Sequence, residues 1–165
     1  MKKIENILFI GFMGCGKSTL AREFARESDR VFIDSDALIE MQFDLSINEI
    51  FAKFGEEFFR KEEQKMANFL TYTRGISLAT GGGFAGVRNL DKIGFCVYLR
   101  ASFEFLKERL SEKEKAKRPL SLDEEKAKKL YHARLSLYEE KANLILDIEN
   151  QSLESLIKEL KKRIK

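Results

Sequence analysis

The sequence predicts an α/β fold in three layers, in which a central parallel sheet of five strands carries helices on both faces. Two observations predict it: short apolar runs without polar alternation, and amphipathic segments that separate these runs. Continuous apolar runs are typical of strands that are buried on both faces. Because strands that alternate with helices pair in parallel, one sheet covered on both faces is expected.

The expected strands, in chain order, are residues 7–10, 31–33, 76–79, 95–99 and 144–146. Between the first two strands, Leu20 and Phe24 stand four residues apart within 17–27, which places both on one face of a helix. In parallel sheets, ligands bind beyond the carboxyl ends of the strands. The residues that follow each strand are therefore the first candidates for a functional site.

Serine residues mark the starts of three later helices. Ser46 and Glu49 have the spacing of a capping box, so a short helix is expected after Ser46. A longer helix is expected over residues 57–72. Ser102 and Ser152 precede two further amphipathic segments and act as N-caps in this interpretation.

The composition is that of a globular protein and excludes several classes of function. The 165 residues fit one domain, so a single domain over residues 1–165 is expected. The 30 basic and 27 acidic side chains leave a net charge of +3, which is too balanced to indicate a nucleic-acid partner. The sequence carries no evident oligomerisation element, and this favours a monomer.

Cysteine and histidine usage excludes a zinc site and indicates a compartment. Cys15 and Cys96 form no CxxC pair, and His132 is the only histidine, so a His/Cys zinc site is not available. Free thiols indicate a reducing compartment. No apolar run approaches the ~20 residues of a membrane span. We therefore expect a cytoplasmic protein without a membrane partner.

Residues 11–19 read GFMGCGKST, directly after the first expected strand and at the start of the first helix. This is the GxxxxGK[ST] pattern, whose backbone N–H groups point at phosphate oxygens. Lys17 then reaches the β- and γ-phosphates, and the Ser18 hydroxyl binds Mg²⁺. The dinucleotide pattern GxGxxG fails because Thr19 stands where its third glycine belongs. The predicted ATP-binding residues on this loop are Gly14, Cys15, Gly16, Lys17, Ser18 and Thr19.

Two aspartates, Asp34 and Asp36, follow the second expected strand. Residues two apart on extended backbone point the same way, so both carboxylates would face the phosphate loop if the strands are neighbours or nearly so. One carboxylate would hold Mg²⁺ and the other would accept the proton of an attacking hydroxyl. The alternative is a helix N-cap, and one aspartate can serve both purposes.

An anion pocket is predicted from arginines and glycines farther along the chain. Arg60 and Glu63 are three apart on a helix, so the carboxylate can hold the guanidinium fork for a bidentate substrate carboxylate. The alternative is an ordinary surface ion pair. Residues 81–83 are three glycines at the end of the third strand, which allow backbone N–H groups to approach a ligand; the alternative is a flexible turn. Arg134 is a candidate second arginine for the substrate carboxylate.

The segment over residues 111–123 is highly charged and contains Arg118 and the only proline, Pro119. We interpret it as a mobile lid that brings Arg118 onto the transferring phosphoryl group. The alternative is a solvated loop with no role in the reaction.

Together these motifs resemble the shikimate kinase family. The resemblance covers essentially the whole chain and rests on GFMGCGKS, DSD, FGEEFFRKEE, TGGG, RPL and RLSLY, in that order. It implies a single three-layer P-loop kinase domain, with a substrate-binding region at about 34–63 and a mobile lid at about 111–123. It also implies transfer of the γ-phosphoryl group of ATP to the 3-hydroxyl of shikimate, in the chorismate pathway to aromatic amino acids, with Mg²⁺ as cofactor.

The same resemblance assigns roles to individual residues. Lys17, Asp36 and Arg118 would be catalytic, and Ser18 and Asp34 would hold the metal. Besides the loop residues, Arg109 and Arg118 would contact ATP. The substrate-binding residues that it implies are Asp36, Phe51, Phe59, Arg60, Glu63, Gly81, Gly82, Gly83 and Arg134. Phe51 and Phe59 would pack around the substrate ring, although either could simply belong to the core.

Two other functions remain open on the sequence. The first is a kinase for another small acid, such as gluconate, because two arginines favour a carboxylate without naming it. The second is a regulatory nucleotide switch, which the absence of a guanine-reading N-K-x-D motif disfavours.

Overall fold

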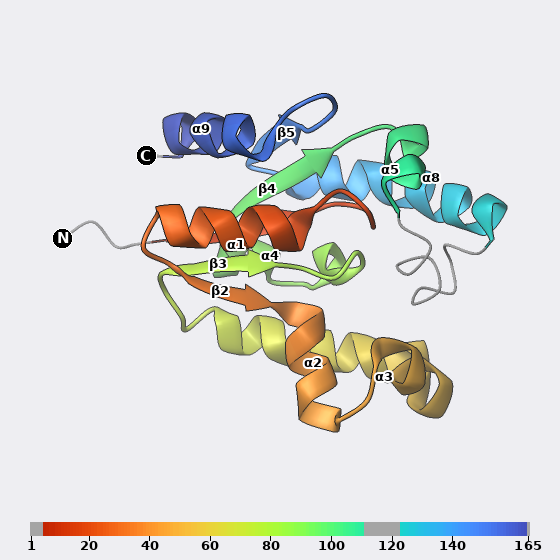
Figure 1. The fold of residues 1–165 in the computed structure, drawn as a ribbon. Helices are drawn as coiled ribbons and strands as arrows, with labels where there is room; N and C mark the ends of the chain where they lie inside the picture. Colours follow the sequence, from red (N-terminus) through yellow and green to blue (C-terminus); the bar gives the residue numbers. More distant parts are fainter. Residues whose placement is uncertain (1–4, 111–122, 165) are drawn as a thin grey trace.

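The computed structural model describes residues 5–110 and 123–164 and contains a parallel sheet of five strands (Figure 1). The strands are β1 (Asn6–Ile10), β2 (Val31–Asp34), β3 (Ile76–Ala79), β4 (Gly94–Arg100) and β5 (Leu144–Asp147). Their spatial order is β2-β3-β1-β4-β5, and every neighbouring pair is parallel. The expected fold class and all five expected strands are confirmed.

Strand β1 lies at the centre of the sheet and is buried along its length. In the register, Ile7 of β1 pairs with Ser77 of β3 and with Phe95 of β4. A strand with a neighbour on each edge and helices on each face meets no water, which explains its unbroken apolar run. The loop that follows β1 is therefore held by the central, fully buried strand of the sheet.

Seven helices and one short 3-10 turn surround the sheet in the described part of the chain. They are α1 (Lys17–Glu27), α2 (Ser35–Phe43), α3 (Ile47–Leu70), η1 (Phe84–Gly86), α4 (Leu90–Ile93), α5 (Phe103–Arg109), α8 (Glu124–Lys141) and α9 (Leu153–Arg163). Figure 1 shows α1 in front of the sheet and α8 behind it, with α2 and α3 beyond the β2 edge. The two faces are thus both covered, as expected for three layers.

The predicted N-caps are present. Ser46 and Glu49 form a complete capping box, in which the Ser46 N–H donates to Glu49 Oε2 at 2.7 Å. The hydroxyls of Ser102 and Ser152 each accept a backbone N–H from the first turn of their helix. Helix α3 bends at Gly55, which has a φ of 84°, and this bend separates the short and long helices that the sequence predicts.

Helix α2 was not expected, and it corrects the prediction for the second aspartate. Asp34 ends β2 in extended conformation, but Asp36 already lies in the first turn of α2. Asp34 Oδ1 accepts the N–H groups of Asp36 and Ala37, so the chain turns into a helix there. The prediction that Asp34 and Asp36 lie on one extended backbone is therefore wrong, and the N-cap alternative is confirmed for Asp34.

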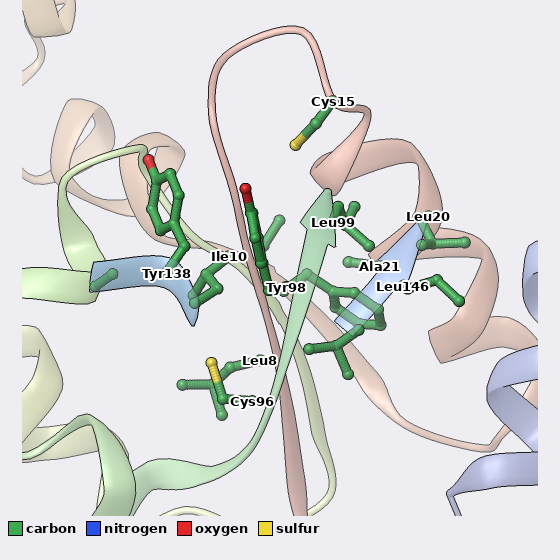
Figure 2. Close-up of a cluster of buried hydrophobic side chains, with 14 of the residues drawn as sticks. Leu8, Ile10, Cys15, Leu20, Ala21, Cys96, Tyr98, Leu99, Tyr138 and Leu146 are labelled. Carbon is green, nitrogen blue, oxygen red and sulfur yellow. The ribbon is translucent and has the colours of Figure 1, made fainter. Parts of the chain in front are cut away.

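The interior is divided into a large core around the sheet and a small one under α2 and α3. Figure 2 shows part of the large core, with Ile10, Tyr98 and Tyr138 on one side of β4 and Leu99, Leu20 and Ala21 on the other. The small core contains Ile39, Ile50 and Phe59. Helices α2 and α3 thus have apolar contacts of their own, beside those of the sheet.

No helix among residues 5–110 and 123–164 is long and apolar enough to cross a bilayer.

The expected lid and its arginine lie largely outside the described residues. Of the expected lid at 111–123, only Asp123 is described, and it caps α8 by accepting the N–H of Lys126. Arg118 lies outside the described residues.

Candidate active site

The loop after β1, residues 11–19, is called the phosphate loop below. Gly14 and Gly16 both have left-handed backbone, with φ of 83° and 85°, and Gly16 is the N-cap of α1. Gly11 has a φ of 149°, and a β-carbon there would lie 2.9 Å from Leu99 O. Glycine is therefore required by conformation or by space at each of these turns. The result is a curled backbone at the N-terminus of an eleven-residue helix, the arrangement that binds phosphate.

Lys17 lies inside the curl of the phosphate loop. Its Nζ donates to Gly11 O at 2.7 Å and to Phe12 O at 3.1 Å. The same ammonium lies 3.6 Å from the sulfur of the buried Cys15. The charge thus stands within the loop that would surround the phosphates, as predicted for the lysine of this motif.

Ser18 and Asp34 meet across the sheet edge. The Ser18 hydroxyl donates to Asp34 Oδ2 at 2.7 Å, while the other oxygen of Asp34 caps α2. Strand β3 lies between β1 and β2, yet the carboxyl ends still bring the two side chains together. A hydroxyl and a carboxylate oxygen are hard ligands of the kind that Mg²⁺ prefers. In the part of the chain that is described, no group of three His, Cys, Asp or Glu side chains forms a separate metal site.

The remaining loop and ATP candidates are more exposed. Thr19 is exposed in the first turn of α1. Arg109, at the end of α5, is also exposed, and its guanidinium lies over the Phe105 ring at 5.5 Å. A β-carbon at Gly16 would lie 3.3 Å from Arg109 Nη2, so this arginine borders the phosphate loop.

The three glycines after β3 face three charged side chains. A β-carbon at Gly82 would lie 2.8 Å from Arg134 Nη1, and one at Gly83 would lie 2.6 Å from Arg60 Nη2. At Gly81 the added atom would collide with the Asp36 carboxylate. None of the three glycines has a left-handed φ, so space and not backbone conformation excludes a side chain here. The acceptor site, as we call it, comprises Asp36, Arg60, Glu63, Gly81, Gly82, Gly83 and Arg134.

Arg60 and Glu63 form a partly buried ion pair, not the ordinary surface pair of the alternative interpretation. Arg60 Nη1 lies 2.6 Å from Glu63 Oε2, and the Glu63 side chain is only 1% exposed. Glu56 adds a second carboxylate to Arg60 at 3.1 Å. Burial raises the pKa of the Glu63 carboxyl, and the charge of Arg60 only partly offsets this effect. Glu63 Oε1 has no hydrogen-bond partner among the described residues.

The two predicted aromatic residues lie together in the small core. The ring centroids of Phe51 and Phe59 are 4.9 Å apart, and Phe59 is buried while Phe51 is half-buried. The guanidinium of Arg60 stands 5.5 Å from the centre of the Phe59 ring. Both rings therefore belong to the small core, and Phe59 also borders the arginine side of the acceptor site.

Two residues of the site were missed from the sequence. The buried Ser35 accepts the N–H of Gly81 at 2.9 Å, so this glycine directs its N–H at the protein instead of a ligand. The Tyr138 hydroxyl donates to Gly82 O at 2.6 Å. Both residues belong to motifs named above, Ser35 to DSD and Tyr138 to RLSLY. Neither residue type in that position indicates by itself that its hydroxyl binds the glycine segment.

A cavity of about 700 Å³ opens beside the acceptor site. Its walls come from α3, from the segment after the three glycines and from α8. Arg60, Glu63, Gly83 and Arg134 all line it. The two arginines thus reach a space large enough for a small metabolite.

The parallel sheet and the phosphate loop after its central strand, with Lys17 inside the loop and Ser18 bound to Asp34, define the class of the protein as a P-loop kinase. The chain belongs to the shikimate kinase family, because the family model described as shikimate kinase matches residues 13–165. It is accordingly an ATP-dependent phosphotransferase, as the sequence predicted.

Relatives and solved structures agree with this assignment. The chain is 39% identical to a shikimate kinase of Helicobacter hepaticus, over 92% of this chain and 91% of the relative. It is 37% identical to a shikimate kinase of Clostridium botulinum, over 96% and 98%. The structure resembles that of shikimate kinase from Acinetobacter baumannii in complex with shikimate, with a TM-score of 0.89, 33% identity and coverage of 98% and 93%.

A kinase for another acid, the alternative raised from the sequence, also appears among the similar solved structures, at lower similarity. A gluconokinase from Sinorhizobium meliloti matches with a TM-score of 0.55 and 16% identity, covering 96% of this chain and 90% of that one. At this level of identity the likeness shows a shared fold and nothing about the acceptor.

Proposed function

We propose that this chain transfers the γ-phosphoryl group of ATP to the 3-hydroxyl of shikimate and releases 3-phosphoshikimate and ADP. The observation that carries the proposal is the meeting of Asp36, Arg60 and Arg134 at three consecutive glycines, beside a phosphate loop. One carboxylate and two guanidinium groups suit an acceptor that offers hydroxyls and a carboxylate. Membership of the family, and the shikimate named for a structural relative, support this acceptor over other acids.

On the nucleotide side, the phosphate loop would hold ATP. Lys17 would neutralise charge on the transferring phosphoryl group, and the backbone N–H groups of the loop would bind the β-phosphate. Ser18 and Asp34 would hold Mg²⁺, because their oxygens lie 2.7 Å apart and are of the right chemical type. When bound, the metal would supply further charge neutralisation. Arg109 would border the nucleotide from above Gly16.

On the acceptor side, Arg60 and Arg134 would bind the carboxylate of shikimate and so fix the position of its ring. Asp36 would accept a hydrogen bond from the attacking hydroxyl and take its proton. Glu63 would hold Arg60 in place, and Phe51 and Phe59 would border the ring. Arg118, the predicted lid arginine, would complete the catalytic set from outside the described residues.

We propose further that the enzyme acts as a monomer in the cytoplasm. Its two thiols support the compartment, because Cys15 and Cys96 are buried and unpaired. Burial also raises the pKa of the Cys96 thiol to about 12, which keeps it unreactive. Sedimentation of the purified chain, with and without ATP and shikimate, tests the monomer.

The deciding experiment is ADP release from the purified chain with Mg-ATP, measured with shikimate, with gluconate and with no acceptor. The proposal requires strong stimulation by shikimate and none by gluconate. Stimulation by gluconate alone would instead establish the rival acid kinase. Equal hydrolysis with and without either acid would contradict an acceptor kinase and favour the nucleotide switch.

A further inference from the structure

We propose that the Tyr138 hydroxyl is the positioning group of the acceptor site, which holds Arg134 and the Gly82 backbone in one arrangement while leaving the charge of Arg134 available. This inference rests on the proposed function of the site. Tyr138 would not touch the acceptor itself, so its role would be exerted through Arg134 and the glycine wall.

The hydroxyl has two partners that belong to different walls of the site. It donates to Gly82 O at 2.6 Å. The charged Arg134 side chain, one helical turn earlier on α8, lies against the same glycine, 2.8 Å from the position of a Gly82 β-carbon, and is near enough to act on the hydroxyl. A phenolic hydroxyl has one proton to donate and lone pairs to accept with, so it can serve the glycine carbonyl and the guanidinium at once. One atom thus connects the segment after β3 to α8.

The ring that carries this hydroxyl cannot move freely. Tyr138 is 1% exposed, and its ring centroid lies 5.2 Å from that of Tyr98 on β4. Figure 2 shows both tyrosines side by side with their hydroxyls pointing toward the carboxyl end of β4. Packing on the sheet therefore fixes where the hydroxyl stands, and the hydroxyl fixes its two partners.

The hydroxyl also stays neutral. Burial raises the pKa of Tyr138 to about 12, although the nearby Arg134 charge acts in the opposite direction. At neutral pH the group therefore keeps the proton that it donates to Gly82 O.

The two arginines of the site are held by different chemistry. Arg60 is bound by Glu63 at 2.6 Å and by Glu56 at 3.1 Å. Within residues 5–110 and 123–164, no carboxylate forms an ion pair with Arg134, although the charge of Glu63 is near enough to influence it. A carboxylate partner would compete with the acceptor's carboxylate for the guanidinium, whereas a neutral hydroxyl orients it without competing.

Tyr138→Phe tests the inference, because it removes the hydroxyl and keeps the ring. The matched control is Tyr131→Phe on the same helix, since the Tyr131 hydroxyl also donates to a backbone oxygen, Ala101 O, at 2.7 Å. We expect the Kd and KM for shikimate to rise about tenfold in Tyr138→Phe. The KM for ATP should stay within about twofold, and Tyr131→Phe should leave the shikimate constants unchanged.

Arg134→Ala, measured alone and with Tyr138→Phe, shows whether the effect passes through the arginine. Each single variant should weaken shikimate binding, and the double variant should bind no worse than Arg134→Ala alone. Arg134→Lys serves as a second probe that leaves the buried ring intact, and it should lose affinity about as Tyr138→Phe does. The Arg134 variants keep the Tyr138 ring, so they test the arginine even if Tyr138→Phe lowers the melting temperature.

Three results would overturn the inference: unchanged shikimate constants in Tyr138→Phe, equal losses in the two tyrosine variants, or full additivity with Arg134→Ala. If the wild-type protein phosphorylates shikimate, each of these three results contradicts only the role of Tyr138, and the proposed function is unaffected. Wild-type protein that neither binds nor phosphorylates shikimate would overturn the proposed function and this inference together.

Discussion

The phosphate loop and the acceptor site lie at the same end of the sheet but are built in opposite ways. The loop is nine consecutive residues that follow β1, and its geometry is largely backbone: left-handed glycines and a helix N-terminus. The acceptor site takes its side chains from α2, α3 and α8 and its wall from the segment after β3. The first is a local structure, while the second exists only when distant elements have packed.

This difference indicates how each site will respond to change. The loop stands on the buried central strand, so substitution of Lys17 or Ser18 should alter chemistry more than shape, whereas its glycines set the shape itself. The acceptor site depends on contacts between side chains of separate helices, such as Arg60 with Glu63 and Arg134 with Tyr138. Substitutions there should alter acceptor binding and leave ATP binding intact.

The largest effect is expected from Asp36→Asn, which keeps the shape of the side chain and removes the proposed base. We expect kcat to fall by about 10²–10⁴-fold, because a general base commonly contributes that much. The KM for ATP should stay within about twofold, since Asp36 does not belong to the phosphate loop. Steady-state ADP release measures both constants. Near-normal kcat in this variant would refute the role of Asp36 as base. It would also weaken the contrast between the phosphate loop and the acceptor site.

A smaller effect is expected from Gly83→Ala, which tests the glycine wall. The added methyl group would displace the Arg60 guanidinium, 2.6 Å from the β-carbon position. We expect the KM for shikimate to rise about tenfold or more, as for the loss of a charge-assisted hydrogen bond.

Gly86→Ala is the matched control for that substitution. It stands three residues further along, and a β-carbon there would meet no atom within 4 Å. Kinetic titration of shikimate at saturating ATP should find this control within about twofold of wild type. Equal behaviour of the two alanine variants would show that the glycines are needed for the turn alone.

The smallest effect, several-fold on the KM for shikimate, is expected from Glu63→Gln. Burial raises the pKa of Glu63, so the native state binds its proton more tightly than the unfolded chain does. Stability from this group is thus greatest at low pH and falls as pH rises through that raised pKa. The melting temperature of Glu63→Gln at pH 7 should therefore be equal to or above that of wild type.

The same substitution makes a prediction about pH. As pH falls toward the raised pKa of Glu63, wild-type Arg60 loses a charged partner, and the KM for shikimate should rise. In Glu63→Gln this acid-side rise should be absent. Profiles of kcat/KM for shikimate and for ATP, run side by side, measure it. A parallel rise in both proteins would assign the pH dependence to another group.

Sequence reasoning was most successful where structure is local. The strands, the serine caps and the phosphate loop each follow from neighbouring residues, and all are present. It failed at Asp36, because the prediction required extended backbone from Asp34 to Asp36, whereas the N-cap at Asp34 turns the chain into α2. The caps at Asp34, Ser102 and Ser152 each depend on a hydrogen bond within three residues, whereas a strand is completed only by pairing with a distant one, such as β1 with β3.

The acceptor site was only partly accessible to such reasoning. Arg60 and Glu63 are one helical turn apart, so their pairing could be expected. The apposition of Gly82 to Arg134 and Tyr138 spans more than fifty residues and depends on how α8 packs behind the sheet. Tyr138 has the burial of a core residue, and only its hydroxyl distinguishes it from one.

The glycine wall has a consequence for how new acceptor preferences can arise. Each of the three positions is matched to a different opposing side chain: Gly81 to Asp36, Gly82 to Arg134 and Gly83 to Arg60. A larger residue at one of them would be accommodated only if its counterpart shortened at the same time. Evolution of this scaffold toward another acid should therefore proceed by paired exchanges, with single-step intermediates that serve neither acceptor well.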